Sequence, residues 1–337
     1  MSNPILVEVT RGDVVESVHR AAIAVADSTG RLIAQWGDTD RVVFPRSAIK
    51  MIQALPLVES GAADAFGLTS EHLALACASH SGEAMHVGRI GSWLGLIGAT
   101  DADLGCGAHY PYADYARDVL VRNGDRPRRI HNNCSGKHTG FLSYARHISA
   151  PFEGYLETHH PVQLAVMDAL ASISQVPVGY WSTGIDGCSA PNFALPLGVW
   201  AGAMARLASG AGQGPERARA GQRLLSAMKA HPELMSGTDR ACAGLIRACQ
   251  GGVVVKTGAE GFFVAILPER GLGVALKVED GATRASEAIM AASLIQLGVL
   301  DPDNPVARNL MHGPVKNWAG VQVGERRVVP EPFSGRL

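Results

Sequence analysis

Apolar and polar residues follow a strand-like pattern at both ends of the chain. Near the N-terminus, three such runs are separated by polar turn residues: Ile5–Thr10, His19–Ala26 and Leu32–Trp36. Near the C-terminus, three more runs share this character: Gly252–Thr257, Phe262–Pro268 and Gly273–Val278. We therefore expect an antiparallel sheet that takes strands from both ends of the chain.

The middle of the chain has helical periodicity instead. Ile49, Ile52, Leu55 and Val58 are spaced for one face of a helix, so the pattern predicts a helix over Arg46–Glu59. Further helices are expected at Ser81–Leu96, His160–Ser174, Pro191–Leu207, Gly214–Lys229 and, after the last strand, Arg284–Leu297.

This order of elements predicts an α+β fold. An antiparallel sheet from both chain ends would be flanked by helices, and the segment between the two ends would form a helical subdomain. We expect a single catalytic unit over 1–337, with a sheet subdomain at about 1–60 and 250–337 and a mostly helical subdomain at about 61–249.

Composition and charge exclude several classes of function. The 337 residues are 47% hydrophobic and 18% charged, as in ordinary globular proteins, and the formal net charge is −1, which gives no electrostatic basis for nucleic-acid binding. No apolar run is long enough to span a membrane, and Met1 to Val18 shows no export signal, so a cytoplasmic location is expected. In a reducing compartment the six cysteines would remain thiols.

Ser47 and Lys50 form a Ser-x-x-Lys motif at the start of the first predicted helix. A spacing of three places both side chains on one helix face, where the lysine amine can activate the serine hydroxyl. By itself the motif is weak, because a solvated surface pair has the same spacing.

Two later segments add to this motif. Lys256-Thr257-Gly258 ends a predicted strand, and together with Ser-x-x-Lys it forms two of the three signatures of serine β-lactamases and penicillin-binding proteins. Ser79, in the segment Ala78–Glu83, could supply the third polar group, although helix capping explains a serine there equally well.

Two segments contain cysteines among other polar residues: His131–His138 and Gly184–Ser189. A pair of thiolates beside a carboxylate and a histidine can hold zinc. Neither segment contains Cys-x-x-Cys, so the spacing gives only a weak metal signal. We expect the other four cysteines to be core thiols: Cys77, Cys106, Cys242 and Cys249.

These motifs together resemble the rhizobial-type, thermolabile and inducible-type L-asparaginase family, which is related to serine β-lactamases and glutaminases. The resemblance covers nearly the whole chain and depends on five segments: Phe44–Lys50, Ala78–Glu83, His131–His138, Gly184–Cys188 and Lys256–Gly261. It implies a serine β-lactamase/glutaminase-like fold, a homodimer, and hydrolysis of L-asparagine to L-aspartate and ammonia.

The resemblance also implies residue roles. Ser47 would be the nucleophile and Lys50 its partner, with Ser79 and Lys256 completing the catalytic group. Zinc would be held by Cys134, Lys137 and Cys188, and would orient the substrate rather than activate the nucleophile. The substrate would be surrounded by Arg46, His138 and Asp186.

The sequence leaves several alternatives open. Two lysines near one serine cannot both hold a proton cheaply, so one should be neutral near pH 7, and the sequence does not tell which. A glutaminase, another serine amidase, or an amino-acid-binding protein without turnover would carry the same residues. A β-lactamase or transpeptidase is disfavoured because those enzymes work outside the cytoplasm.

Overall fold

The computed structural model of the chain describes residues 2–333, which fall into two compact units. The sheet unit comprises residues 2–48, 194–211 and 244–333, and the helical unit comprises residues 49–193 and 212–243. Residues 49–60 lie in the helical unit, whereas the expected sheet subdomain included them. Residues 194–211 and 244–249 lie in the sheet unit, whereas the expected helical subdomain included them. Among the described residues, no helix combines the length and apolar character needed to cross a membrane.

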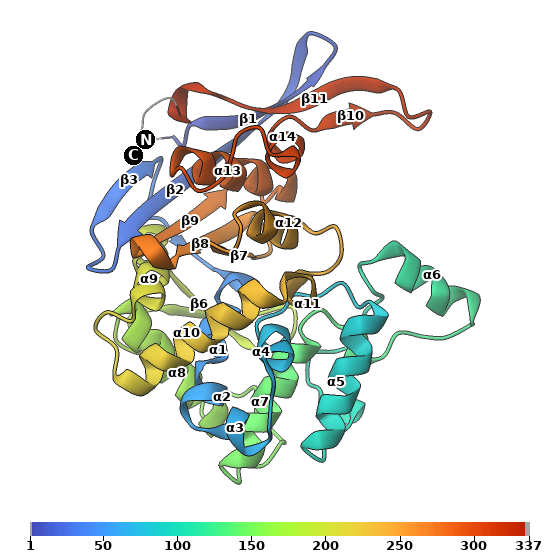
Figure 1. Cartoon of the computed structure of the whole chain (residues 1–337), viewed down its shortest axis with the longest axis vertical. Coiled ribbons are helices and arrows are strands. Elements are labelled where there is room, and N and C mark those ends of the chain that lie inside the picture. The colour runs from blue at the N-terminus through green and yellow to red at the C-terminus, as the bar shows by residue number, and fades with distance from the viewer. Residues whose placement is uncertain (1, 334–337) are drawn as a thin grey trace. The chain divides into compact units, whose positions relative to one another are not determined.

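The sheet unit is built on an antiparallel sheet with the strand order β10-β11-β1-β2-β9-β8-β7. Strand β3 pairs with the C-terminal half of β2, from Ile23 to Ala26. The strands are β1 (Ile5–Arg11), β2 (Val14–Asp27), β3 (Leu32–Trp36), β7 (Val254–Thr257), β8 (Phe262–Leu267), β9 (Leu272–Val278), β10 (Pro314–Lys316) and β11 (Gln322–Val328). Because β1 pairs with β11, segments from the two chain ends lie side by side (Figure 1). The expected α+β class and the sheet formed from both ends are confirmed.

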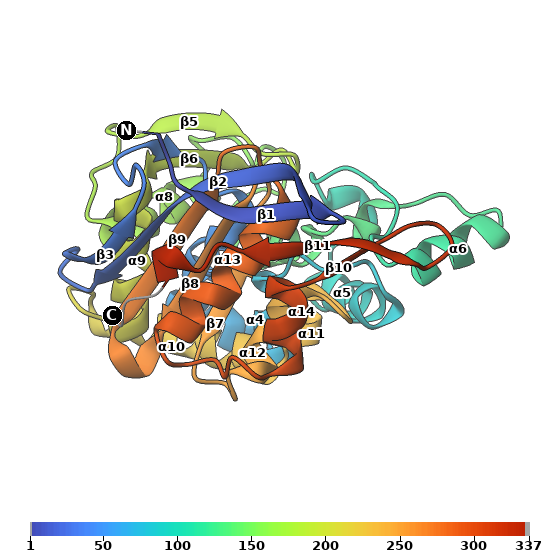
Figure 2. The same ribbon diagram turned by 90° about the horizontal axis from the view of Figure 1, so that it is seen from above.

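Helices cover the two faces of this sheet. Helix α9 (Leu197–Ser209) packs directly on β9, where a Cβ on Gly273 would lie 2.2 Å from the carbonyl oxygen of Ala201. Helix α13 (Thr283–Gln296) crosses the opposite face, with α14 (Pro305–Met311) beside it (Figure 2). The predicted helix Arg284–Leu297 is therefore confirmed to within one residue at each end.

The register of the sheet places Lys256 on the face covered by α9. Lys256 lies opposite Val264, and Val264 lies opposite Ala275. Directly opposed residues of antiparallel strands share a face, and Ala275 is two residues from Gly273, which faces α9. Lys256 is consequently fully buried although β7 is an edge strand.

The predicted helix Pro191–Leu207 is wrong over its first six residues. Residues Pro191–Pro196 form the strand β6, which pairs with β4 (Val42–Val43), and α9 begins only at Leu197. Proline cannot donate a backbone hydrogen bond, so Pro196 is suited to precede a helix but not to continue one. A short apolar run fits a buried strand and a buried helix equally well, and here the strand forms.

The helical unit contains ten α-helices among its described residues, together with the 3-10 helices η2 (Asp101–Asp103) and η3 (Arg129–His131) and strand β5 (Ser182–Ile185). The α-helices are α1 (Lys50–Gln53), α2 (Leu55–Glu59), α3 (Ala62–Ala65), α4 (Ser70–Ala76), α5 (Ala84–Leu96), α6 (Asp114–Arg122), α7 (Ser135–His147), α8 (Pro161–Ser174), α10 (Pro215–Ala230) and α11 (Pro232–Ser236). Helix α12 (Ala241–Ala248) spans the point where the chain passes from this unit to the sheet unit.

The single helix expected over Arg46–Glu59 is interrupted. It consists of the 3-10 helix η1 (Arg46–Ile49), α1 and α2, with a break at Ala54. Pro56 has no N–H to continue the hydrogen-bond ladder of α1, which accounts for the break.

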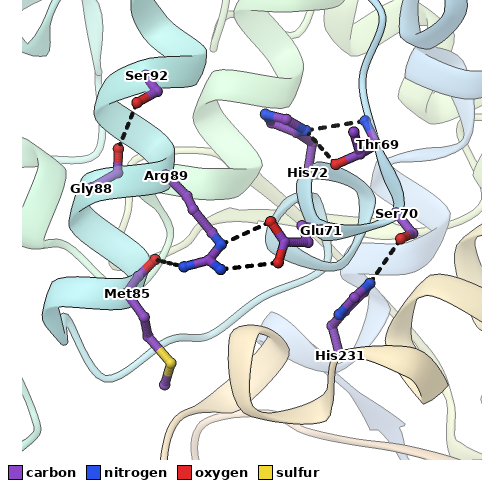
Figure 3. A network of polar contacts seen from close by, with 9 residues as sticks. All are labelled: Thr69, Ser70, Glu71, His72, Met85, Gly88, Arg89, Ser92 and His231. Atoms are coloured by element: carbon purple, nitrogen blue, oxygen red, sulfur yellow. Dashed lines mark hydrogen bonds and ion pairs between the residues drawn. The ribbon is translucent and has the colours of Figure 1, made fainter.

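Helix α4 is held by polar contacts on two sides. Arg89 of α5 donates two hydrogen bonds of 2.9 Å to Glu71, and Ser70 lies 2.7 Å from the ring of His231 (Figure 3). These contacts fix the helix that leads into the Ala78–Glu83 loop.

Candidate active site

Lys50 lies at the centre of a polar cluster in the helical unit. Its side chain is only 1% exposed, and its Nζ lies 2.5 Å from the carbonyl oxygen of Ala78, 3.0 Å from Ser79 Oγ and 3.1 Å from Cys134 Sγ. A buried amine needs such partners, because an unpaired buried charge is costly. The structure thus brings together Lys50, Ser79 and Cys134, which are distant in sequence.

Ser47 stands one turn before Lys50 on the same stretch of chain. The helix η1 ends at Ile49, and α1 begins at the next residue, so the two helices follow without a loop. Arg46, immediately before Ser47, has φ = 52°, a left-handed conformation that is unfavourable for a residue with a side chain. Such strain is found at functional sites when the surrounding structure enforces it.

The Lys256-Thr257-Gly258 motif meets the segment around Ser47 within the sheet unit. A Cβ on Gly258 would lie 2.4 Å from the carbonyl oxygen of Pro45 and 3.4 Å from Cβ of Ala48. Only glycine permits this approach of two backbones. Lys256 Nζ donates a hydrogen bond of 2.8 Å to the carbonyl oxygen of Thr257. The two motifs that the sequence separates by about 200 residues are therefore neighbours.

A second close approach positions the cysteine segment. A Cβ on Gly136 would lie 2.3 Å from the carbonyl oxygen of Leu75, so the first turn of α7 rests against the end of α4. Asn132 then holds the segment: its side chain accepts a hydrogen bond from the N–H of Cys134 and donates one to the carbonyl oxygen of Cys106, each 2.8 Å long.

Two thiols and a carboxylate gather next to Lys137. The ligand atoms of Cys134, Asp186 and Cys188 all lie within 4.8 Å of one another. Lys137 Nζ is 3.0 Å from Cys188 Sγ, and Cys188 Sγ is 3.2 Å from a carboxylate oxygen of Asp186. Helix α7 supplies Lys137 from its first turn, and the loop after β5 supplies Asp186 and Cys188.

Hydrogen bonding and charge separate the acidities of these groups. The hydrogen bond from Cys134, helped by the Lys137 ammonium, lowers the pKa of Cys188 to about 5 despite burial. The same bond, together with burial, raises the pKa of Cys134 to about 12. Burial alone would lower the pKa of Lys137, but its interactions with Cys188 and Cys134 raise the pKa above its usual value. These shifts make Cys188 the more acidic thiol of the pair.

The donor set fits a zinc ion. Zinc prefers thiolate sulfur and nitrogen donors, and tetrahedral bonds of about 2.3 Å to sulfur put two such ligands roughly 3.8 Å apart. Cys134 and Cys188 supply two sulfurs within 4.8 Å of each other, Lys137 offers nitrogen, and Asp186 offers a further oxygen. The expectation that the cysteine segments can hold a metal is supported, and Asp186 joins the possible ligands.

His138 and Glu83 are two further buried polar residues of the helical unit. Burial holds the pKa of His138 well below its usual range, and its Nδ1 lies 2.6 Å from the hydroxyl of Tyr155. The carboxylate of Glu83, 2% exposed, accepts hydrogen bonds from the N–H and hydroxyl of Thr238 at 2.8 Å and from the hydroxyl of Tyr115 at 2.7 Å. Burial would raise the pKa of Glu83, but the bonds from Tyr115 and Thr238 outweigh it and lower the pKa.

The predicted site residues divide between the two units. Seven lie in the helical unit, and three lie in the sheet unit: Arg46, Ser47 and Lys256. Glu83 and Tyr155 also take part in the buried hydrogen bonds, although no role is expected for them from the sequence. Glu83 ends the segment Ala78–Glu83 and directly precedes α5, which is a capping signal, whereas nothing in the sequence around Tyr155 indicates its contact with His138. All six cysteines are buried free thiols, as expected.

The fold and the cluster define an α+β protein in which lysine, thiol and carboxylate groups are gathered in a buried site. The family model for L-asparaginase II matches residues 7–328, and the chain therefore belongs to the L-asparaginase II family. No curated protein matches the chain.

Several solved structures are similar at low identity. A β-lactamase from Mycobacterium bovis is 17% identical, with 82% of this chain and 94% of that chain covered and a TM-score of 0.39. Mglu in its native form is 18% identical, with coverages of 85% and 67% and a TM-score of 0.39. D-alanine carboxypeptidase AmpC from Burkholderia cenocepacia is 15% identical, with coverages of 83% and 93% and a TM-score of 0.41.

Proposed function

We propose that the protein is an L-asparaginase, which hydrolyses the side-chain amide of L-asparagine to L-aspartate and ammonia. The observation that carries the proposal is the family match over residues 7–328, which includes every candidate residue. The cluster around Lys50 supports it, because amide hydrolysis needs an activated nucleophile and groups that stabilise the developing negative charge.

Ser47 is the proposed nucleophile. As its Oγ attacks the amide carbon, its proton passes to a neutral lysine amine, and the ammonium of the other lysine stabilises the oxyanion. Ammonia then leaves with a proton returned by the base, and water hydrolyses the acyl-enzyme with the same base. Lys50 and Lys256 are the two lysines. The contact of 3.0 Å between Lys50 Nζ and Ser79 Oγ supports a proton path through Ser79.

Substrate binding is assigned to Arg46, His138 and Asp186. Arg46 offers a cation, His138 a buried imidazole and Asp186 a carboxylate, which suit the carboxylate and ammonium groups of an amino acid. We propose that Cys134, Lys137 and Cys188 hold zinc, which when bound would supply an electrophilic centre for the amino-acid end of the substrate. We also propose a homodimer, to be checked by light scattering after size exclusion.

Ammonia release from L-asparagine and from L-glutamine tests this function directly. We expect turnover of asparagine, its loss in Ser47→Ala, and losses of several orders of magnitude in Lys50→Met and Lys256→Met. Lys316→Met is the matched control, because Lys316 is exposed on β10. Preferential turnover of glutamine would make the protein a glutaminase, and binding of asparagine without ammonia release would make it an amino-acid-binding protein.

The nucleophile assignment has its own test. If Ser47→Ala kept more than a small fraction of wild-type activity while folding normally, Ser47 would not be the nucleophile and Ser79 would be the next candidate.

A lysine base also predicts activity that rises from mildly acidic to alkaline pH, so a flat pH–rate profile would contradict a lysine base.

A further inference from the structure

Tyr155 and His138 form a buried pair in the helical unit. Tyr155 is 4% exposed and His138 is fully buried. The Tyr155 hydroxyl accepts a hydrogen bond of 2.7 Å from the N–H of Gly105 and lies 2.6 Å from Nδ1 of His138. Gly105 permits this arrangement, because a Cβ there would lie 3.1 Å from the Tyr155 hydroxyl and 2.6 Å from the side chain of Leu156.

The single hydrogen of the Tyr155 hydroxyl determines which group donates in the bond between Tyr155 and His138. A phenol has one hydrogen to donate and can accept from others. Within residues 2–333, Gly105 and His138 are the two hydrogen-bond partners of the Tyr155 oxygen, and Gly105 can only donate. If His138 also donated, the buried phenolic hydrogen would have no acceptor, which is costly. Tyr155 therefore donates to Nδ1 of His138.

An imidazole whose Nδ1 accepts must carry its hydrogen on Nε2. His138 Nε2 is buried, and no described residue forms a hydrogen bond with it. Buried polar groups without partners are rare, and an N–H donor left in this way is suited to a bound acceptor. A carboxylate oxygen is a favourable acceptor for such a donor, because a hydrogen bond to an ionised partner is about twice as strong as one between neutral groups.

We propose that Tyr155 is a positioning residue that holds His138 in the Nε2–H tautomer, so that this N–H binds a carboxylate oxygen of the amino-acid substrate. The inference rests on the proposed function for the identity of the substrate. The tautomer itself follows from Tyr155, Gly105 and His138 alone.

Nitrogen-15 NMR of the purified protein tests the tautomer without turnover. Long-range proton–nitrogen spectra distinguish the two ring nitrogens, and His138→Gln assigns the signal. We expect the wild type to show protonated Nε2 and bare Nδ1, with a shift at Nε2 when L-aspartate is added. Protonated Nδ1 in the wild type, or no response of Nε2 to L-aspartate, would overturn the proposal.

Kinetics of Tyr155→Phe test the positioning role. The ring is kept and only the hydroxyl is lost, so we expect KM for L-asparagine to rise about tenfold, the size of one hydrogen bond, with kcat changed less than KM. An unchanged KM in the folded variant would refute the role. If this variant does not fold, His138→Gln, which can place an amide N–H near the Nε2 position, should retain a lower KM than His138→Asn, and equal values would refute it. A wild type inactive on asparagine would refute the proposed function and leave the NMR test intact.

Discussion

Substitution of Glu83 tests how much the buried hydrogen bonds of the helical unit contribute to stability. Its buried carboxylate accepts three hydrogen bonds, two from Thr238 and one from Tyr115. Thr238 is 155 residues away along the chain, so these bonds connect distant segments. A parallel bond from the N–H of Ser79 to the carbonyl oxygen of Met235 links the same two segments at the candidate site.

The expected cost of Glu83→Gln follows from these three bonds. Glutamine keeps one acceptor oxygen for the N–H of Thr238, and the hydroxyls of Thr238 and Tyr115 must turn to accept from the new NH2 group. A hydrogen bond to a charged group contributes about 1.5–3 kcal/mol and a neutral one about 0.5–1.5 kcal/mol, so each of the three bonds weakens by about 1 kcal/mol. An amide is cheaper to bury than a carboxylate, which offsets part of this loss. We therefore expect the free energy of unfolding, measured by urea denaturation at pH 7, to fall by about 2 kcal/mol.

Acid should remove this difference. The hydrogen bonds lower the folded-state pKa of Glu83 below its ordinary value of 4.5. A lowered carboxyl pKa gives a stabilisation that is complete above the unfolded pKa and is lost as pH falls through the folded pKa. The gap between wild type and Glu83→Gln should therefore close below about pH 4.5.

Glu71→Gln is the matched control. Glu71 makes two hydrogen bonds to Arg89, but both side chains are about 40% exposed, so the pair should contribute less than about 1 kcal/mol (Figure 3). Equal small losses in Glu71→Gln and Glu83→Gln would refute the reasoning that the burial of Glu83 makes its bonds strong.

Three other outcomes test the fold and the cluster. Gly258→Ala should lower stability by about 1–3 kcal/mol and reduce ammonia release, because its Cβ would lie 2.4 Å from a backbone oxygen; Gly88→Ala, which has open space, should be harmless in the same assays. Burial lowers the pKa of His86 below its ordinary value of 6.5, so the unfolded state takes up the proton before the folded state does. As the pH drops below about 6.5, the free energy of unfolding should therefore decrease, by up to about 1.4 kcal/mol per pH unit for this group. Equal free energies of unfolding at pH 7 and pH 5.5 would count against this prediction. Metal analysis should find about one zinc per chain, and Cys188→Ala should lose it and raise KM more than it lowers kcat, whereas metal-free enzyme with unchanged kinetics would return the cysteines to a packing role.

The sequence predicts the central strands well because their patterns are unambiguous. All six residues of β8 are apolar and buried, and β3 has the predicted ends. The hairpin of β10 and β11 was not predicted, because β11 is only partly buried and contains Glu325, Arg326 and Arg327 in succession. A strand of this kind is recognised only through its partner β1, which lies at the other end of the chain.

The same distinction applies to the site. The spacing of Ser47 and Lys50 is local, and so it is visible in the sequence. The contact of Lys50 with Cys134 and that of Glu83 with Thr238 depend on tertiary folding, which local patterns do not encode. A resemblance to a family supplies the first of these contacts indirectly, by naming its residues, but it does not supply the second.

Two glycines allow backbone segments that are distant in sequence to pack directly against each other, and this packing positions the side chains near them. Gly258 brings β7 against the backbone before Ser47, and Gly136 brings α7 against the end of α4, in both cases by direct backbone contact. The positions of Lys256 and Cys134 are therefore set by main-chain packing rather than by their own side chains. It follows that substitutions at these two residues should alter chemistry or metal binding while the fold persists. Substitutions at the two glycines should instead displace Lys256 and Cys134 while leaving both side chains intact. Comparing the two kinds of variant therefore distinguishes the effect of a side chain's position from the effect of its chemistry.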